Sequence, residues 1–123
     1  MEADKKKALV LLKSLIFHYH GLDKDERKIL DSRVAEMEAE KEFEWALQFI
    51  SSDYLSAFDR SREFLAKVFS KMEKRERLTH LNEVWEDNHK KGYVTEMETT
   101  AMINLAKDWS IEEDFIKEIN KIP

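Results

Sequence analysis

The chain has 123 residues, of which 42% are apolar and 38% are charged, and it contains two glycines, one proline and no cysteine. A chain of this length folds as about one domain with one ordinary core. The absence of cysteine excludes disulfides, thiol nucleophiles and cysteine-ligated metal centres. The scarcity of glycine and proline excludes an all-β fold, which needs many turns. The formal net charge of −5 disfavours non-specific binding to nucleic acid or to an anionic membrane.

The longest apolar stretch, Ala8–Phe17, is interrupted by Lys13 and Ser14. It is shorter than the ~20 apolar residues that span a membrane. Lys5–Lys7 precede it as in a signal peptide, but the uninterrupted apolar run is only Ala8–Leu12, and no small-residue cleavage site follows. We therefore expect a cytoplasmic protein that does not span a membrane and whose first helix is buried.

Apolar residues at helical spacing predict three helices in the first half of the chain. The first covers about residues 3–19, and the chain breaks at His20-Gly21. Asp23 and Glu26 have the spacing of a capping box, in which each side chain accepts a hydrogen bond from the other residue's backbone, and they begin a second helix. A third covers about residues 40–51. The apolar positions expected to be buried are Ala8, Leu9, Leu12, Leu15, Ile16 and Tyr19, then Ile29, Leu30, Val34 and Met37, then Phe43, Leu47, Ile50 and Tyr54.

Four more helices are predicted after a break at Ser51–Asp53. The fourth ends near Met72, and the fifth covers about residues 73–89 and is ended by Gly92. The pairs Thr95/Glu98 and Ser110/Glu113 are further capping boxes, which begin the sixth and seventh helices. The expected core positions are Leu55, Phe58, Leu65, Val68, Phe69 and Met72, then Leu78, Leu81, Val84 and Trp85, then Ala101, Met102, Leu105 and Ala106, then Phe115, Ile116 and Ile119. The sequence predicts an all-α protein, a single bundle of about seven helices with no linker.

The capping boxes at Asp23 and Thr95 are 72 residues apart, and a shift by that distance aligns other features as well. The coinciding apolar positions include Leu9 with Leu81, Leu12 with Val84, Leu30 with Met102, Val34 with Ala106, Met37 with Trp109, Phe43 with Phe115, and Leu47 with Ile119. This pattern suggests an internal duplication, with halves at roughly residues 3–51 and 73–122 related by a pseudo-two-fold axis.

The two turns also carry a family resemblance. Gly92, Val94, Thr95 and Glu98 fit a turn of the form Asp-Gly-x-Ile-(Ser/Asp)-x-x-Glu, and Leu22, Asp23 and Glu26 fit it in the first half. Two copies of this turn are typical of the TerB-like family, which this chain resembles over about residues 9–119. That helical domain is named for bacterial tellurite resistance, and a related one occurs at the N-terminus of certain membrane-anchored DnaJ-type co-chaperones. The family's aspartate is replaced here by Lys91 and Tyr19, and a lysine repels a divalent cation.

The resemblance implies one TerB-like domain over residues 1–123 and a non-catalytic role. Such a protein would be a cytoplasmic interaction module of a bacterial stress-response (tellurite-resistance-type) or membrane-associated system, bound to another protein or to a second copy of itself. It would be recruited to a membrane protein rather than span the membrane. A chaperone system is a further option; because the chain has no J-domain signature, that role would act through another protein.

The alternative is a divalent-metal-responsive domain using His18, His20, Asp87 and His89, which flank the two equivalent turns. Neutral imidazole and carboxylate suit zinc or nickel. However, the rings of a His-x-His pair at a helix end point about 200° apart, and histidines near helix C-termini also complement the helix dipole. We expect no other cofactor.

A partner surface is predicted in the middle of the chain. Trp45 and Phe49 lie off the apolar stripe of the third helix, so this helix is either buried on all sides or half of an interface. A basic stretch that would suit an acidic protein or a phosphate group follows it, with Arg60, Arg62, Lys67, Lys71, Lys74 and Arg75 as its candidate binding residues. No nucleic-acid-binding motif is present, and we expect no nucleic-acid partner.

No catalytic motif is recognised. The chain lacks a Gly-x-Ser-x-Gly elbow, a phosphate-binding glycine loop and a His-Glu-x-x-His pair. The alternate acids between Glu36 and Glu44 scatter around a helix and indicate a solvated face rather than a calcium loop. We therefore expect that the protein is not an enzyme.

Overall fold

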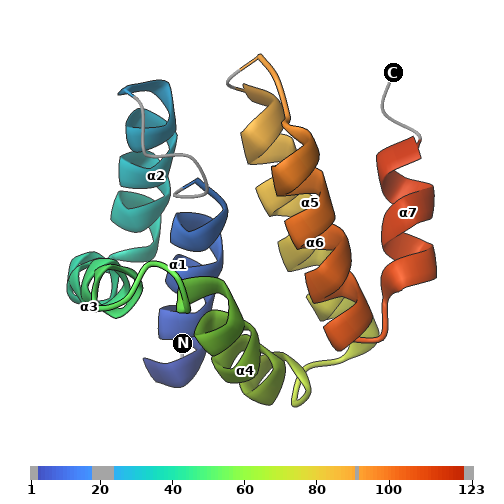
Figure 1. Ribbon diagram of the computed structural model, residues 1–123, viewed down its shortest axis with the longest axis horizontal. Coiled ribbons are helices and arrows are strands. Elements are labelled where there is room, and N and C mark those ends of the chain that lie inside the picture. The colour runs from blue at the N-terminus through green and yellow to red at the C-terminus, as the bar shows by residue number, and fades with distance from the viewer. Residues whose placement is uncertain (1–2, 18–23, 91, 121–123) are drawn as a thin grey trace.

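The computed structural model describes residues 3–17, 24–90 and 92–120, and these residues form seven α-helices and no strand (Figure 1). The helices are α1 (Ala3–Phe17), α2 (Lys24–Met37), α3 (Glu40–Ser51), α4 (Ala57–Phe69), α5 (Lys74–Lys90), α6 (Glu96–Asp108) and α7 (Glu112–Asn120). They pack around one continuous hydrophobic core. The predicted all-α fold, a single bundle of seven helices, is confirmed.

α1 is the central helix of the bundle. All nine residues from Ala8 to Ile16 are buried, and α1 contacts α2, α3, α4, α5 and α6. A helix that is apolar on nearly all sides needs such a surrounding layer, which explains the run Ala-Leu-Val-Leu-Leu at residues 8–12. The prediction that the first helix is buried is confirmed. None of the described helices has the length and apolar character to cross a membrane.

The other six helices form two groups around α1. In Figure 1, α2, α3 and α4 lie at its side, with α3 seen end-on, and α5, α6 and α7 stand together as a second group. The three helices of the second group contact one another, and contacts of α1 with α5 and of α4 with α6 join the groups. The core is therefore continuous between the two groups of helices.

The start of α6 is capped as the sequence predicts. The Thr95 hydroxyl accepts a hydrogen bond from the Glu98 backbone N–H at 3.1 Å, and the Glu98 carboxylate accepts one from the Thr95 N–H at 3.0 Å. This reciprocal pairing satisfies two backbone donors that the first turn of a helix leaves free. The equivalent pair in the first half involves Asp23, which lies outside the described residues.

The prediction that Ser110 caps α7 is wrong. Ser110 has a positive φ of 58° and ends α6, and α7 begins at Glu112. An N-cap residue has an extended backbone, whereas a left-handed residue is typical of a helix C-terminus. The capping-box spacing at Ser110 and Glu113 is therefore coincidental.

The turn after α2 has the same geometry as the turn after α6. Glu38 has a φ of 51° and lies 72 residues before Ser110. The paired bonds are Glu38 N–H to Ala35 O (3.1 Å) and Ala39 N–H to Val34 O (3.0 Å), and Ser110 N–H to Lys107 O (3.1 Å) and Ile111 N–H to Ala106 O (2.9 Å). Both sets are Schellman motifs, which satisfy the last carbonyls of a helix. The recurrence concerns local turn geometry, and the duplication of the two halves stays a prediction.

Two residues expected in the core lie on the surface. Tyr54 is 66% exposed and Leu55 is 99% exposed, because both belong to the turn between α3 and α4. The Asp53 carboxylate accepts a hydrogen bond from the Leu55 N–H at 3.1 Å. Such a local side-chain bond competes with helix formation, so α4 begins only at Ala57.

Candidate functional site

Three aromatic side chains form a cluster at the junction of α3 and α4, which we name the aromatic corner. The ring centroid of Trp45 lies 5.2 Å from that of Phe49 and 5.4 Å from that of Phe64. All three residues are partly buried and pack against the edge of the core. These separations are typical of favourable aromatic pairs. Trp45 and Phe49 are thus neither central core residues nor fully exposed ones.

Two cations lie against these rings. The Lys7 ammonium is 5.1 Å from the centroid of the Trp45 ring, and the Arg60 guanidinium is 4.8 Å from that of Phe49. Cations at such distances are attracted by the electron-rich ring faces. The sequence indicated Arg60 but not Lys7, because Lys7 reaches Trp45 from another helix.

Arg60 also ties the end of α3 to the following turn. Its guanidinium donates to the backbone carbonyls of Phe49 and Asp53, both at 2.9 Å, and to the Ser56 hydroxyl at 2.8 Å. The Asp53 carboxylate accepts a further bond from the Ser56 hydroxyl at 2.8 Å. This bond, together with the Leu55 N–H and the charge of Arg60, lowers the pKa of Asp53. The turn that carries Leu55 is therefore fixed by hydrogen bonds to an ionised Asp53.

The predicted basic stretch divides into two kinds of residue. Arg62 binds the Asp108 carboxylate with two hydrogen bonds of 2.8 Å, and Lys74 pairs with Asp114 at 2.9 Å. These two cations connect α4 to α6 and α5 to α7. By contrast, Lys67, Lys71 and Arg75 are exposed. Within the described part of the chain, no carboxylate forms an ion pair with any of these three.

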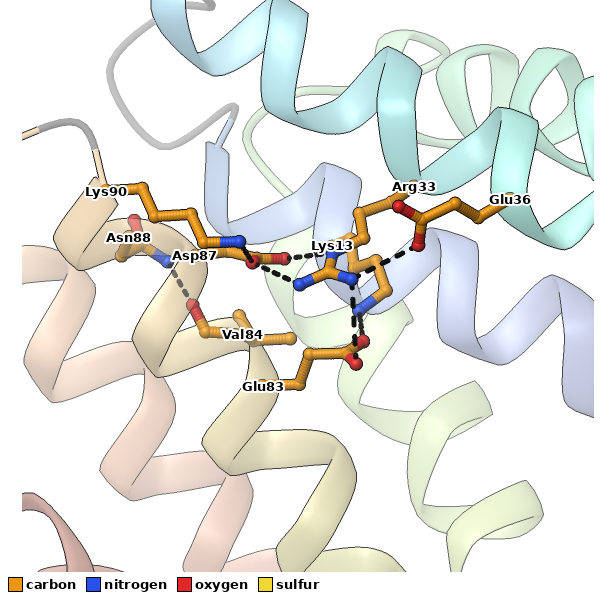
Figure 2. A network of polar contacts seen from close by, with 8 residues as sticks. All are labelled: Lys13, Arg33, Glu36, Glu83, Val84, Asp87, Asn88 and Lys90. Carbon is orange, nitrogen blue, oxygen red and sulfur yellow. Dashed lines mark hydrogen bonds and ion pairs between the residues drawn. The ribbon is translucent and has the colours of Figure 1, made fainter.

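A second group of polar side chains links α1 and α2 to α5 (Figure 2). Arg33 from α2 donates to both oxygens of Asp87 on α5, at 3.0 and 2.8 Å. Lys13 from α1, only 4% exposed, pairs with Glu83 on α5. The remaining contacts are Arg33 Nη1 to Glu36 (3.2 Å), Arg33 Nη1 to Glu83 (3.9 Å) and Lys90 Nζ to Asp87 (3.3 Å). Buried charges are stable only when they are paired in this way.

Two groups of this network, Arg33 and Glu83, have shifted pKa values. The hydrogen bonds to Asp87 raise the pKa of Arg33. Burial by itself raises the pKa of Glu83, but the bond and charge of Lys13 and the charge of Arg33 outweigh it, so the pKa of Glu83 lies below its ordinary value of 4.5. Sequence reasoning missed this network except for Asp87, because its ion pairs join residues as far apart as 70 positions.

We predict that Glu83 makes the stability of the fold sensitive to acid. A carboxylate with a lowered folded-state pKa stabilises the fold above its unfolded value of 4.5, and this stabilisation is lost as the pH falls through the lower folded value. Glu83→Gln should therefore be less stable at pH 7 and should lose less stability than the wild type between pH 7 and about pH 3. Urea denaturation at several pH values measures both effects. Parallel pH profiles of the two proteins would contradict the prediction.

Of the four residues in the metal hypothesis, the structure describes Asp87 and His89. Asp87 is 1% exposed and is bound by Arg33, and His89 is exposed with its ring 4.8 Å from the Trp85 ring. His18 and His20 lie outside the described residues. Among the residues that the structure describes, no three His, Asp or Glu side chains are grouped so that they could hold a metal ion.

Comparison with known proteins does not extend these observations. No protein-family model, no curated protein and no solved structure matches the chain. The class that the fold defines is thus a small all-α helical bundle, and membership of the TerB-like family is a proposal.

Proposed function

We propose that this protein is a non-catalytic, TerB-like protein-interaction module that binds its partner through the surface formed by α3, the α3–α4 turn and α4. The observation that carries the proposal is Leu55, which is 99% exposed although its turn is fixed by hydrogen bonds. Full burial of a leucine side chain is worth about 1.5–3 kcal/mol. In the folded chain the exposed Leu55 side chain does not contribute this burial free energy, and a partner with an apolar pocket would gain it on binding.

The neighbouring residues support the same proposal. Tyr54 is also exposed, and Arg60 connects the turn directly to Phe49 of the aromatic corner. Aromatic residues and arginine are enriched in the energetically important centres of interfaces. Because the turn is already ordered, binding costs little additional conformational entropy.

The resemblance to the TerB-like family supports a wider role as a cytoplasmic module of a stress-response or membrane-associated system. The divalent-metal-responsive domain is the weaker alternative, because the Asp87 carboxylate that it would use is held by two hydrogen bonds from Arg33.

The proposal can be tested by replacing Leu55 with a photo-crosslinking amino acid in the protein's own cells. We expect a discrete crosslinked product, whose mass distinguishes a second copy of the chain from another protein. With that partner purified, Leu55→Asp should weaken binding about tenfold or more, which corresponds to about 1.4 kcal/mol. The unfolding free energy should change by no more than about 0.5 kcal/mol, because the substitution is on the surface.

Met97 provides a matched control, since it is an exposed apolar residue of α6 with 55% of its surface accessible. A crosslinker at Met97 should give no such product, and Met97→Asp should leave binding unchanged. Equal products at both positions, or unchanged binding by Leu55→Asp, would overturn the proposal.

A further inference from the structure

α2 is attached to the bundle by a narrow face. Its buried residues are Glu26, Leu30 and Val34, which follow one another at intervals of about one turn and form a single stripe. Only two of these three side chains are apolar, whereas α1 buries an unbroken run of nine residues. Because the burial of apolar surface is the main favourable term in folding, α2 is held to the core more weakly than α1.

The link between α2 and α5 is made by charges. The principal packing neighbours of α2 are α1 and α3, and Figure 1 shows α2 at the edge of its group of helices. α5 is not one of these neighbours, and Arg33 joins the two helices through its ion pairs with Asp87 and Glu83 (Figure 2). Arg33 lies beside the buried stripe, between the half-buried Ile29 and Met37.

The Arg33–Asp87 pair holds α2 in place less firmly than an apolar contact of the same size would. Two charges lose their hydration when they are buried, and separation returns it, so the net contribution of an intact buried pair is small. Loss of one partner has a much larger effect, because the other charge then stays buried without its counterion. The position of α2 is therefore sensitive to a change in either charge.

The turn after α2 gives its release a fixed end. Ala39 is 0% exposed, and the Lys6 ammonium donates a hydrogen bond to the Glu38 carbonyl at 3.0 Å. The next helix, α3, is held in the core by its own buried side chains, Phe43, Ala46 and Ile50. Detachment of α2 can therefore stop at Glu38 without displacing α3.

We propose that α2 is a lid that opens as a unit up to the Glu38–Ala39 turn while the other six helices stay folded, and that the ion pair of Arg33 with Asp87 is its latch. The segments of a protein with few buried apolar contacts are those that open locally at the lowest free energy. Opening exposes the stripe of Leu30 and Val34 together with the surface of α1 that it covers, and it returns the latch charges to water.

Native-state thiol labelling tests this proposal, because the chain contains no cysteine of its own. Val34→Cys places a thiol in the buried stripe of α2, and Val84→Cys is the matched control at a buried valine of α5. We expect Val34→Cys to be labelled at least about tenfold faster in the absence of urea. Its labelling rate should rise with urea, but less steeply than that of Val84→Cys, since release of one helix exposes less surface than global unfolding.

Second-site substitutions identify the latch and the part that stays folded. Arg33→Ala should accelerate the labelling of Val34→Cys about a hundredfold. Arg27→Ala, which removes an exposed pair of the same helix, should change it less than about fivefold. Phe69→Leu weakens the contact of α4 with α6, so it should accelerate the labelling of Val84→Cys and leave that of Val34→Cys unchanged.

The proposal is overturned if both thiols are labelled at the same rate with the same urea dependence, because α2 would then open only when the whole protein unfolds. Labelling of Val34→Cys that is independent of urea would also overturn it, since that result indicates a local fluctuation rather than a detached helix. If Arg33→Ala and Arg27→Ala accelerate labelling equally, Arg33 is not the latch. The lid is separate from the surface around Leu55, so none of these results affects the proposed function.

Discussion

Arg33→Ala is expected to lower the free energy of unfolding by about 3 kcal/mol or more, in the range for a broken buried ion pair. The substitution leaves the Asp87 carboxylate, 1% exposed, with only Lys90 at 3.3 Å as a paired cation. Because Lys90 is exposed, it compensates only part of the hydration that the buried carboxylate has lost, and a poorly paired buried charge is costly. Urea denaturation monitored by circular dichroism measures the loss.

Two variants separate this effect from the mere loss of an arginine. Arg27→Ala removes an exposed pair with Asp31 within α2 and should cost less than about 1 kcal/mol. The double variant Arg33→Met/Asp87→Leu removes both charges and should recover most of the stability that Arg33→Ala loses. If Arg33→Ala is no more destabilising than Arg27→Ala, the pair with Asp87 does not contribute as we argue.

Phe69→Ala is expected to destabilise the protein by about 3–5 kcal/mol. Phe69 is 0% exposed and stacks on Trp109 with ring centroids 3.9 Å apart and planes at 3°. This contact joins the end of α4 to the end of α6, so the cavity would open where the two groups of helices meet. Thermal unfolding should shift downward by on the order of 10 °C or more for a domain of this size.

Phe69→Leu is the matched control, because it keeps most of the buried apolar volume and should cost about half as much or less. Equal losses for the leucine and alanine variants would show that the ring stacking, rather than the filled volume, supplies the stability. A loss below about 1 kcal/mol for Phe69→Ala would contradict the assigned position of Phe69 in the core.

Features that depend on neighbours a few residues away could be predicted well. The third helix was predicted at about residues 40–51 and is observed as α3, Glu40–Ser51. The capping box of Thr95 and Glu98 and the buried face of α6 were also predicted correctly. Helical periodicity and capping are local interactions, so the sequence contains the information they need.

The errors arose where a local pattern has two interpretations. Ser110 has the spacing of a capping box but adopts a left-handed conformation that ends α6. Leu55 continues an apolar stripe, yet the Asp53 side chain holds it in a turn at the surface. In both places, a competing hydrogen bond of the backbone decided the conformation.

The sequence by itself determined that this protein is all-α, that it forms one bundle and that α1 is buried. The composition, the helical spacing of apolar residues and the apolar run at residues 8–12 indicate these features without any knowledge of which helices pack together. Only the tertiary structure decided which charges pair, because Arg33 and Asp87 are 54 positions apart and meet only after α2 and α5 come together. The same packing decided that Arg62 is bound by Asp108 while Lys67 is left exposed. Hydrophobic burial brings distant residues together without regard to their spacing in the chain. The sequence could therefore indicate the basic stretch, but not which of its charges are paired in the folded protein.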